Sequence, residues 1–283
     1  MSYSHNVYVL GAGFSAARGF PLTTNFLVAL RDAHLWLVTS GRTEEAAAVQ
    51  KVLEFRLSST SATYRIPIDL ENIEELFSLA SAAGDSLARD IRIAIAATLD
   101  FCASTAAVPT TAFRMTPDGP DVPGFRQGRT ESPVLGASAD HRVSTYDFVV
   151  AGLIGRLGEP RETAGNTFVS FNYDLLVDEA MSRLQIPFSY GFGTNSSTHD
   201  PSARCLTLSD GPQVLLLKLH GSTNWALSAG REDQLTVYGA YEDIRRSGLA
   251  PELVPPTWRK SYSRPLAAVW NHALAEFKKA LES

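Results

Sequence analysis

Three short apolar runs along the chain each end in small or polar residues. They are Asn6–Leu10 before Gly11, Thr167–Phe171 before Asn172, and Val214–Leu219 before His220. Runs of this length, partly β-branched, predict strands that are buried on both faces. Because ligands of parallel sheets bind at the carboxyl ends of the strands, the residues after each run are candidates for a functional site.

Between and after these strands, apolar residues recur at i, i+3 and i+4 spacing. This period predicts helices over Leu22–Thr39, Asn72–Ala83, Ser86–Ser104, Tyr146–Leu157, Leu175–Leu184 and Leu266–Leu281. Strands that alternate with helices predict an α/β fold, namely a Rossmann-like parallel sheet with helices on both faces. We expect a single domain over residues 1–283 with a helical insertion from about residue 32 to 106.

Two stretches lack a clear period. Residues Ala107–His141 hold five prolines and four glycines, which predicts an irregular loop over about residues 107–141, between the insertion and the return to the sheet. Tyr190–Gly211 is polar and rich in serine and glycine, and we expect a mobile loop there beside the site.

Composition narrows the classes of protein that fit. The 283 residues are 45% hydrophobic and carry a formal net charge of -5, which is ordinary for a globular chain and gives no global basic field for direct nucleic-acid binding. The cysteines, Cys102 and Cys205, are too few for a zinc ribbon, and no metal is expected. Without a signal peptide or an apolar run long enough to span a membrane, we expect a cytoplasmic protein with no membrane partner.

The first candidate motif is the glycine-containing turn after the first strand, VYVLGAGFSAARGFP from Val7 to Pro21. Backbone amides at such a turn can approach phosphate groups, and Gly11, Gly13 and Ala16 fit a loose dinucleotide-binding pattern. Pro21 would break the long crossover helix that an ordinary dehydrogenase needs. A purely structural turn between a core strand and a helix explains the motif equally well.

Polar residues also follow the other two strands. Asn172 and Asp174 in FVSFNYDLLVDE stand where helix caps are common, so capping is one explanation for them. His220 in KLHGSTNW leaves an apolar strand before a glycine, which suits either a general base at the sheet edge or a half-buried histidine in a turn. Taken together, the three motifs predict a single crevice with a phosphate-binding turn, an Asn/Asp pair and an imidazole.

The motifs also match a known family when they are read in order. The chain resembles the sirtuin family, in particular its prokaryotic branch that hydrolyses NAD in antiviral defence, in GAGFS…GFP, FNYD and HGS. Two further segments are similar to that branch, DLENIEELFSLAS (Asp69–Ser81) and PPTWRKSYSRPL (Pro255–Leu266). The resemblance runs from Val7 to the C-terminal helix and implies a single sirtuin-like domain.

The resemblance implies which residues contact NAD, the substrate. Asn172 and Asp174 match the nicotinamide–ribose pocket of the family, and His220 matches its catalytic histidine. The resemblance also assigns cofactor contacts to Gly11, Ala12, Gly13, Phe14, Ser15, Pro21, Gly221 and Ser222. The implied reaction is cleavage of the nicotinamide–ribose bond, which gives nicotinamide and ADP-ribose without a metal.

The chain departs from the family at several points. Protein-deacylating sirtuins carry four zinc cysteines and continue their glycine motif with Ile-Pro-Asp-Phe-Arg, whereas this chain reads Phe20-Pro21-Leu22-Thr23-Thr24. Both differences disfavour deacylation. The family also continues from a helix like Leu266–Leu281 into one more strand and an adenosine-binding loop, and we expect that strand to be absent because the sequence stops at Ser283.

The expected function is therefore an NAD glycohydrolase that acts in antiviral defence. The alternative is a module that binds NAD or ADP-ribose without catalysis and signals to a partner, which thermal stabilisation by the ligand without product formation would reveal. Because the chain shows no sensor of its own, we expect a sensor protein or a further C-terminal region as partner. We also expect a homo-oligomer.

Overall fold

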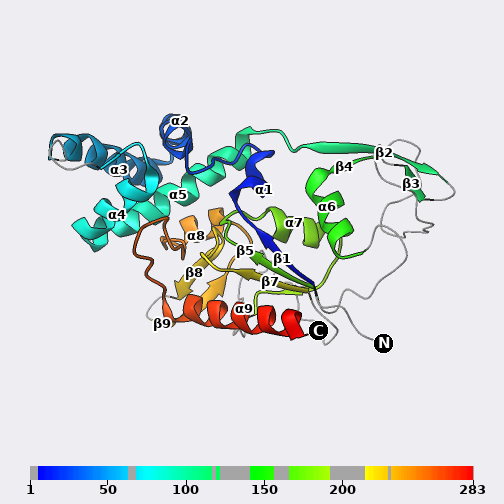
Figure 1. Ribbon diagram of the computed structural model, residues 1–283. Coiled ribbons are helices and arrows are strands. Elements are labelled where there is room, and N and C mark those ends of the chain that lie inside the picture. Colours follow the sequence, from blue (N-terminus) through cyan, green and yellow to red (C-terminus); the bar gives the residue numbers. More distant parts are fainter. Residues whose placement is uncertain are drawn as a thin grey trace.

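Figure 1 shows the computed structural model of the protein, which describes residues 6–62, 68–116, 119–121, 141–155, 166–191, 214–228 and 231–282. At its centre is a sheet of four parallel strands in the order β1-β5-β7-β6. The strands are β1 (Asn6–Leu10), β5 (Asn166–Ser170), β7 (Val214–Lys218) and β6 (Phe188–Ser189). The α/β class with a parallel sheet is confirmed, and the three predicted strands are correct to within one residue at each end.

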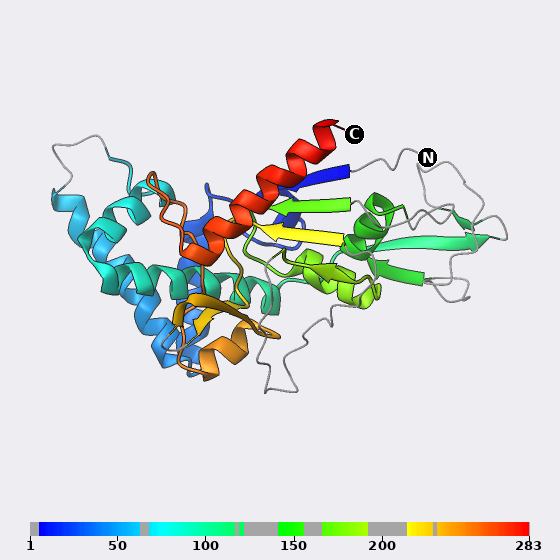
Figure 2. The ribbon, with the colours of Figure 1, turned by 90° about the horizontal axis from the view of Figure 1, so that it is seen from below.

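Alternate residues of the central strands enter two separate cores. Phe168 of β5 and Leu216 of β7 are buried in the main core, which also includes residues of α6 (Thr145–Leu153) and α7 (Leu176–Arg183). The next residue along each strand enters a second cluster beneath α9 (Arg264–Glu282), which consists of Val169, Leu217, Leu219, Val269 and Ala273. Figure 2 shows α9 lying across β1, β5 and β7. Helices therefore cover both faces of the sheet, as the apolar runs predicted.

The region after β1 forms a group of helices at one end of the sheet (Figure 1). These are α2 (Phe26–Thr39), α3 (Thr43–Ala62), α4 (Ile73–Ala83) and α5 (Asp85–Thr105), with α5 packed against the other three. The helix predicted from Leu22 begins at Phe26, because the Asn25 side chain accepts the Leu22 amide in a turn before the helix. The spacing of apolar residues did not predict α3. Its buried face includes the small residues Ala46 and Ala48, so it differs little in hydrophobicity from its exposed face.

The irregular loop predicted over residues 107–141 is wrong in part. The chain forms β2 (Thr110–Thr116), which pairs antiparallel with β3 (Gly119–Asp121) and with β4 (His141–Ser144). The β-branched and aromatic residues of TTAFRMT favour a strand. Prolines and glycines in the surrounding sequence obscured that pattern. The rest of the predicted loop, residues 117–118 and 122–140, lies outside the described residues.

Most of the second predicted loop, Tyr190–Gly211, also lies outside the described residues. Its first residue, Tyr190, is buried in the main core, and its hydroxyl donates to the carboxylate of Asp178. Tyr190, the residue after β6, is therefore packed into the core.

Short elements complete the fold. They are α1 (Ala12–Ala16), α8 (Tyr241–Arg246) and the antiparallel pair of β8 (Trp225–Ser228) and β9 (Arg231–Val237). α1 ends before Pro21, as the proline predicted. Among the residues that the structure describes, no helix has both the length and the apolar character to cross a membrane.

Candidate functional site

The carboxyl ends of β1, β5 and β7 lie side by side. Leu10 is in register with Ser170, which is in register with Lys218. The ladder continues one residue further, because the Phe171 amide donates to the Leu10 carbonyl at 3.0 Å and the Leu219 amide to the Ser170 carbonyl at 2.9 Å. The three motifs therefore start from neighbouring points on one edge, as predicted from their positions after parallel strands.

Hydrogen bonds join the glycine turn directly to the Asn/Asp motif. The Asn172 side-chain amide donates to the Gly11 carbonyl at 2.9 Å and to the Ser15 hydroxyl at 3.0 Å. Ser15 in turn donates to Asp174 Oδ2 at 2.6 Å. Because these bonds fix which side of the amide is the donor, Asn172 Oδ1 is left with no donor among the described residues.

Asp174 is a buried carboxylate with several partners. Besides Ser15, its side chain accepts the Leu176 amide at 3.1 Å at the start of α7, where Leu175 occupies the N-cap position. Burial raises the pKa of Asp174, while attraction by the Lys218 ammonium and the two hydrogen bonds act against this rise and repulsion by Asp178 adds to it. The helix-capping explanation for Asp174 therefore holds only in part, because the carboxylate binds the first amide of α7 from the position before the N-cap, and the same carboxylate also lines the cavity described next.

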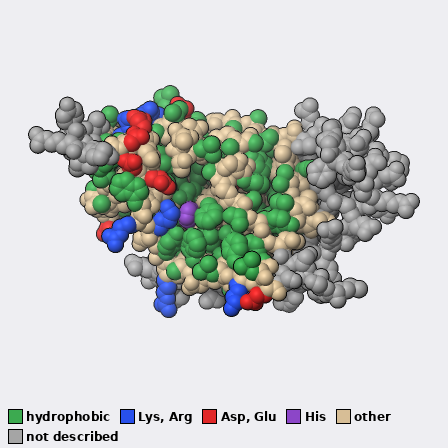
Figure 3. Space-filling view, viewed as in Figure 1, with side chains coloured by type: hydrophobic (Ala, Val, Ile, Leu, Met, Phe, Trp, Pro, Cys, Tyr) green, Lys and Arg blue, Asp and Glu red, His purple; other side chains and the backbone are tan. Residues whose placement is uncertain are grey.

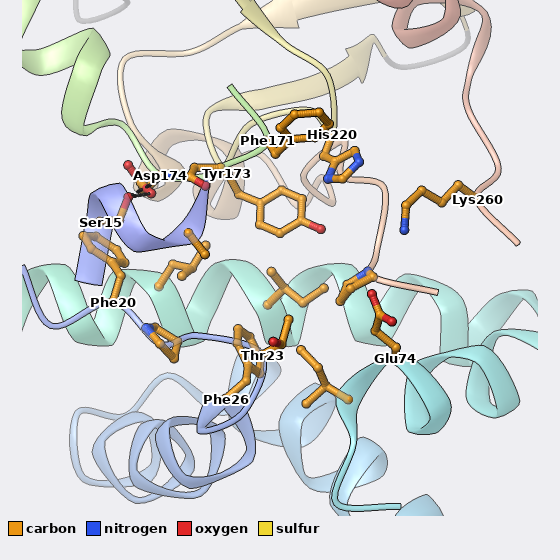
Figure 4. Close-up of a pocket in the computed structure, with 17 residues that line it drawn as sticks. Ser15, Phe20, Thr23, Phe26, Glu74, Phe171, Tyr173, Asp174, His220 and Lys260 are labelled. Carbon is orange, nitrogen blue, oxygen red and sulfur yellow. Dashed lines mark hydrogen bonds between the residues drawn. The ribbon is translucent and has the colours of Figure 1, made fainter. Parts of the chain in front are cut away.

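The motifs surround a cavity of about 200 Å³ (Figure 4). Ser15 and Asp174 lie at one end, with Phe20 beside them, and His220 and Lys260 lie toward the other end with Tyr173 between. Glu74 of α4 faces the cavity below Lys260. The complete lining is Ala12, Ser15, Phe20, Pro21, Thr23, Phe26, Ile73, Glu74, Ile95, Leu99, Phe171, Asn172, Tyr173, Asp174, His220, Pro256 and Lys260.

His220 is a partly buried imidazole between aromatic rings. Its ring lies 5.2 Å from that of Phe171 and 6.2 Å from that of Tyr173. Burial and the nearby Lys260 ammonium lower the pKa of His220 to about 4, although a hydrogen bond to the Phe171 backbone favours the charged form. The imidazole is therefore neutral at pH 7 and can accept a hydrogen bond or a proton.

In the space-filling view, hydrophobic side chains gather on the face where β1 and α9 lie (Figure 3).

The residues that the sequence singled out fall into two groups. Those that line the cavity are Ala12, Ser15, Pro21, Asn172, Asp174 and His220. Gly11 takes part through its carbonyl, which Asn172 binds. Gly13, Phe14, Gly221 and Ser222 are not among the described residues of the lining. The Phe14 ring packs against Tyr146 at 5.2 Å, and the buried Ser222 hydroxyl donates to Asn224.

Gly221 has a structural task next to His220. Its φ is +82°, and a Cβ there would lie 2.0 Å from the Glu252 carbonyl oxygen. We expect Gly221→Ala to lower the free energy of unfolding by more than about 1 kcal/mol, because neither the backbone conformation nor the space admits a side chain. Thermal denaturation measures this, with Gly13→Ala as control, since a Cβ at Gly13 meets nothing within 4 Å. Equal melting temperatures for the two variants would contradict the assignment.

Several cavity residues were not identified from the sequence. Phe20 and Tyr173 are neighbours of predicted residues in the motifs, whereas Glu74 and Lys260 come from segments far away in the chain. The Trp258 amide donates to the Ser78 hydroxyl at 2.8 Å, and this contact brings the segment before α9 against α4. The resemblance of both segments to one family was the only signal for them.

Comparison with known proteins does not assign the chain. No protein-family model matches it, and no curated protein matches it significantly. Within the described part of the chain, no group of three or more His, Cys, Asp or Glu residues is placed to hold a metal ion.

Proposed function

We propose that the protein is a sirtuin-like NAD glycohydrolase, which cleaves the bond between nicotinamide and ribose. The observation that carries this proposal is the hydrogen-bonded set Gly11–Asn172–Ser15–Asp174, of which Asn172, Ser15 and Asp174 line one cavity with the neutral imidazole of His220. In Rossmann-like folds, a dinucleotide binds at the carboxyl ends of the parallel strands, next to the glycine turn after the first strand, and the cavity occupies the corresponding place. The role in antiviral defence is proposed on the resemblance alone.

The size and lining of the cavity suit the reacting part of NAD. Its volume of about 200 Å³ is below the roughly 300–1,000 Å³ of pockets for drug-sized ligands, so it would hold a ring and its ribose and not a whole dinucleotide. Phe20, Phe26 and Tyr173 offer aromatic walls, and Asp174 offers a negative charge for the pyridinium cation. Gly11 and Gly13 are exposed beside it, with open space around both, where the phosphates would lie.

The reaction needs no group beyond NAD, water and these side chains. The bond between ribose C1′ and the pyridinium nitrogen breaks, and its electron pair stays on nicotinamide, which leaves neutral. Water adds to C1′ and releases one proton, so the products are nicotinamide, ADP-ribose and H⁺. Asn172 Oδ1 would hold the water or a ribose hydroxyl, and His220 would accept the proton. Asp174 would stabilise the cationic ring before it leaves.

The direct test is chromatography of NAD after incubation with the purified chain. We expect nicotinamide and ADP-ribose in equal amounts, at a rate proportional to protein concentration. Intact NAD with clear thermal stabilisation of the protein by NAD would refute hydrolysis and support a binding module. The pKa of His220 near 4 favours this second function, because a weaker base accepts a proton less readily at pH 7 than a histidine of ordinary pKa does.

The pH dependence of cleavage tests the role of His220. A histidine can accept a proton only while it is neutral. Because the pKa of His220 is near 4, the imidazole stays neutral at pH values well below 6.5, the pKa of an ordinary histidine. We expect the loss of rate that follows His220 protonation to occur as the pH falls through about 4. In Lys260→Gln this loss should occur at higher pH, because the ammonium that lowers the pKa is gone.

Initial rates between pH 3.5 and 8 provide the measurement, with Lys278→Gln as control because Lys278 is exposed on α9. Protonation of Asp174 should cause a second loss of rate in acid, at a higher pH than for an ordinary aspartate because its pKa is raised. Lys260 is not among the groups that shift the pKa of Asp174, so Lys260→Gln should leave this second loss in place. A pH profile that Lys260→Gln leaves unchanged would contradict the role of His220 as proton acceptor.

A further inference from the structure

Lys218, the last residue of β7, is a buried cation directly behind the candidate site. Its side chain is 1% exposed. Nζ donates to the backbone carbonyl of Asp174 at 2.6 Å and to the Asp178 carboxylate at 3.2 Å. The same carboxylate accepts the Tyr190 hydroxyl. Lysine is almost never fully buried unless it is paired, so this position within an apolar strand calls for an explanation.

The buried charges around Lys218 do not cancel. Asp174 and Asp178 are both buried carboxylic acids, whereas Lys218 supplies a single ammonium. That ammonium contacts the carboxylate of Asp178, but of Asp174 it contacts only the backbone. When both acids are ionised, the Asp174 carboxylate, which lines the cavity, is therefore the charge that no ammonium or guanidinium of the described residues contacts directly. A buried charge of this kind attracts a ligand of opposite charge.

The ion pair is a costly way to end a strand if stability is its only purpose. Apolar residues of similar volume at a buried ion pair are often as stabilising, because they avoid desolvating two charges. An apolar residue at position 218 would, however, leave the pKa of Asp174 higher still. Burial is the main cause that raises this pKa, and attraction by Lys218 is the largest influence that lowers it.

We propose that Lys218 is a positioning residue that gives the cavity its preference for cationic ring ligands. It fixes the backbone at Asp174, balances Asp178, and so keeps the Asp174 carboxylate ionised toward the cavity. The inference rests on the proposed function, because a pyridinium cation is the leaving group that NAD would present. The inference extends that function because it says that the cavity distinguishes its ligands by the positive charge of their ring.

Other charged and titratable groups also surround Asp174. They are Arg18, Glu74, Asp100, Tyr146, Tyr173, Asp178, Glu179, Lys218, His220, Tyr241 and Lys260. Three of them are held by other partners: Arg18 donates to the carbonyls of Ala103 and Ala106, Asp100 pairs with Arg42, and Glu179 pairs with Arg183. Lys218 is thus the cation whose replacement acts most directly on Asp174.

The test uses two ring probes, 1-methylnicotinamide, which is a pyridinium cation, and nicotinamide, which is neutral. Binding of both to the full chain is measured by calorimetry from pH 4 to 8. We expect the parent to prefer the cation and to lose that preference as the pH falls through the pKa of Asp174. In Lys218→Met/Asp178→Asn this midpoint should move up, with a loss of cation affinity on its acid side, because the attraction by Lys218 that lowers the pKa is larger than the repulsion by Asp178 that is removed with it. The double variant leaves no unpaired buried charge at either position.

Asp178→Asn alone should move the midpoint down, because the repulsion by Asp178 that raises the pKa of Asp174 is gone while Lys218 remains. If Lys218 had only a structural role, the variants would bind both probes more weakly, and their midpoints would not move in opposite directions. Midpoints that stay in place, or a parent without cation preference, would overturn the inference. If circular dichroism shows the double variant unfolded, the downward shift in Asp178→Asn decides alone.

Cleavage of NAD is measured on the same samples to separate the two proposals. Cleavage with unmoved midpoints would refute the role of Lys218 and leave the hydrolase intact. Shifted midpoints without cleavage would refute hydrolysis and leave the cation preference intact.

Discussion

Replacing His220 by alanine is expected to lower the rate of NAD cleavage by at least about a hundredfold, the usual contribution of a positioned proton acceptor. The ring shares one cavity with Asn172 and Asp174, and it is held in place by contacts with Phe171 and Tyr173. The loss should appear mainly in kcat, because the imidazole acts on the water and contributes little to binding of the dinucleotide. Chromatographic initial rates over a range of NAD concentrations measure both parameters.

The matched control is His34→Ala. His34 lies on α2 and is not among the cavity residues, so its replacement should leave the rate unchanged. Melting temperatures of both variants establish that the comparison is between folded proteins. A His220→Ala protein that cleaves NAD at the parental rate would remove this residue from the mechanism.

Much of the fold could be predicted from the sequence because its strands and helices have strong periods. The runs that became β5 and β7 are mostly apolar, as strands buried on both faces require, whereas the expectation of two buried faces is wrong for β1, which lies at the edge of the sheet and leaves Val9 54% exposed. β2 was missed because prolines and glycines around Thr110–Thr116 suggested a loop, although pairing with β4 stabilises the strand. Pairing with a distant strand therefore determined that Thr110–Thr116 forms a strand, which the local sequence alone did not indicate.

The candidate site could be predicted only where its residues follow strands. Asn172, Asp174 and His220 were identified because parallel strands bring their ends together. Glu74 and Lys260 depend on how α4 and the segment before α9 pack, which no local pattern reveals. Lys218 did leave a signal, since a single lysine interrupts VLLLKL, but its partner Asp178 could be found only from the structure.

Replacing Asn172 by alanine is expected to reduce NAD cleavage by about a hundredfold, similar to the loss of a preorganised polar group at a reacting centre. Two of its hydrogen bonds, to the Gly11 carbonyl and the Ser15 hydroxyl, hold the glycine turn against β5. We therefore also expect the free energy of unfolding to fall by about 1–3 kcal/mol, because partners of the amide are left unsatisfied. Chromatographic rates and thermal denaturation measure the two effects on the same protein.

The control is Asn271→Ala on the exposed side of α9, which should change neither quantity. The two effects of Asn172→Ala arise from different atoms, since the amide nitrogen makes the structural bonds and Oδ1 would act on water or ribose. A variant that melts earlier but cleaves NAD normally would show that Asn172 only joins the glycine turn to β5. A folded variant with little cleavage would instead place Oδ1 at the reacting centre, because the loss of packing alone does not remove turnover from the folded fraction.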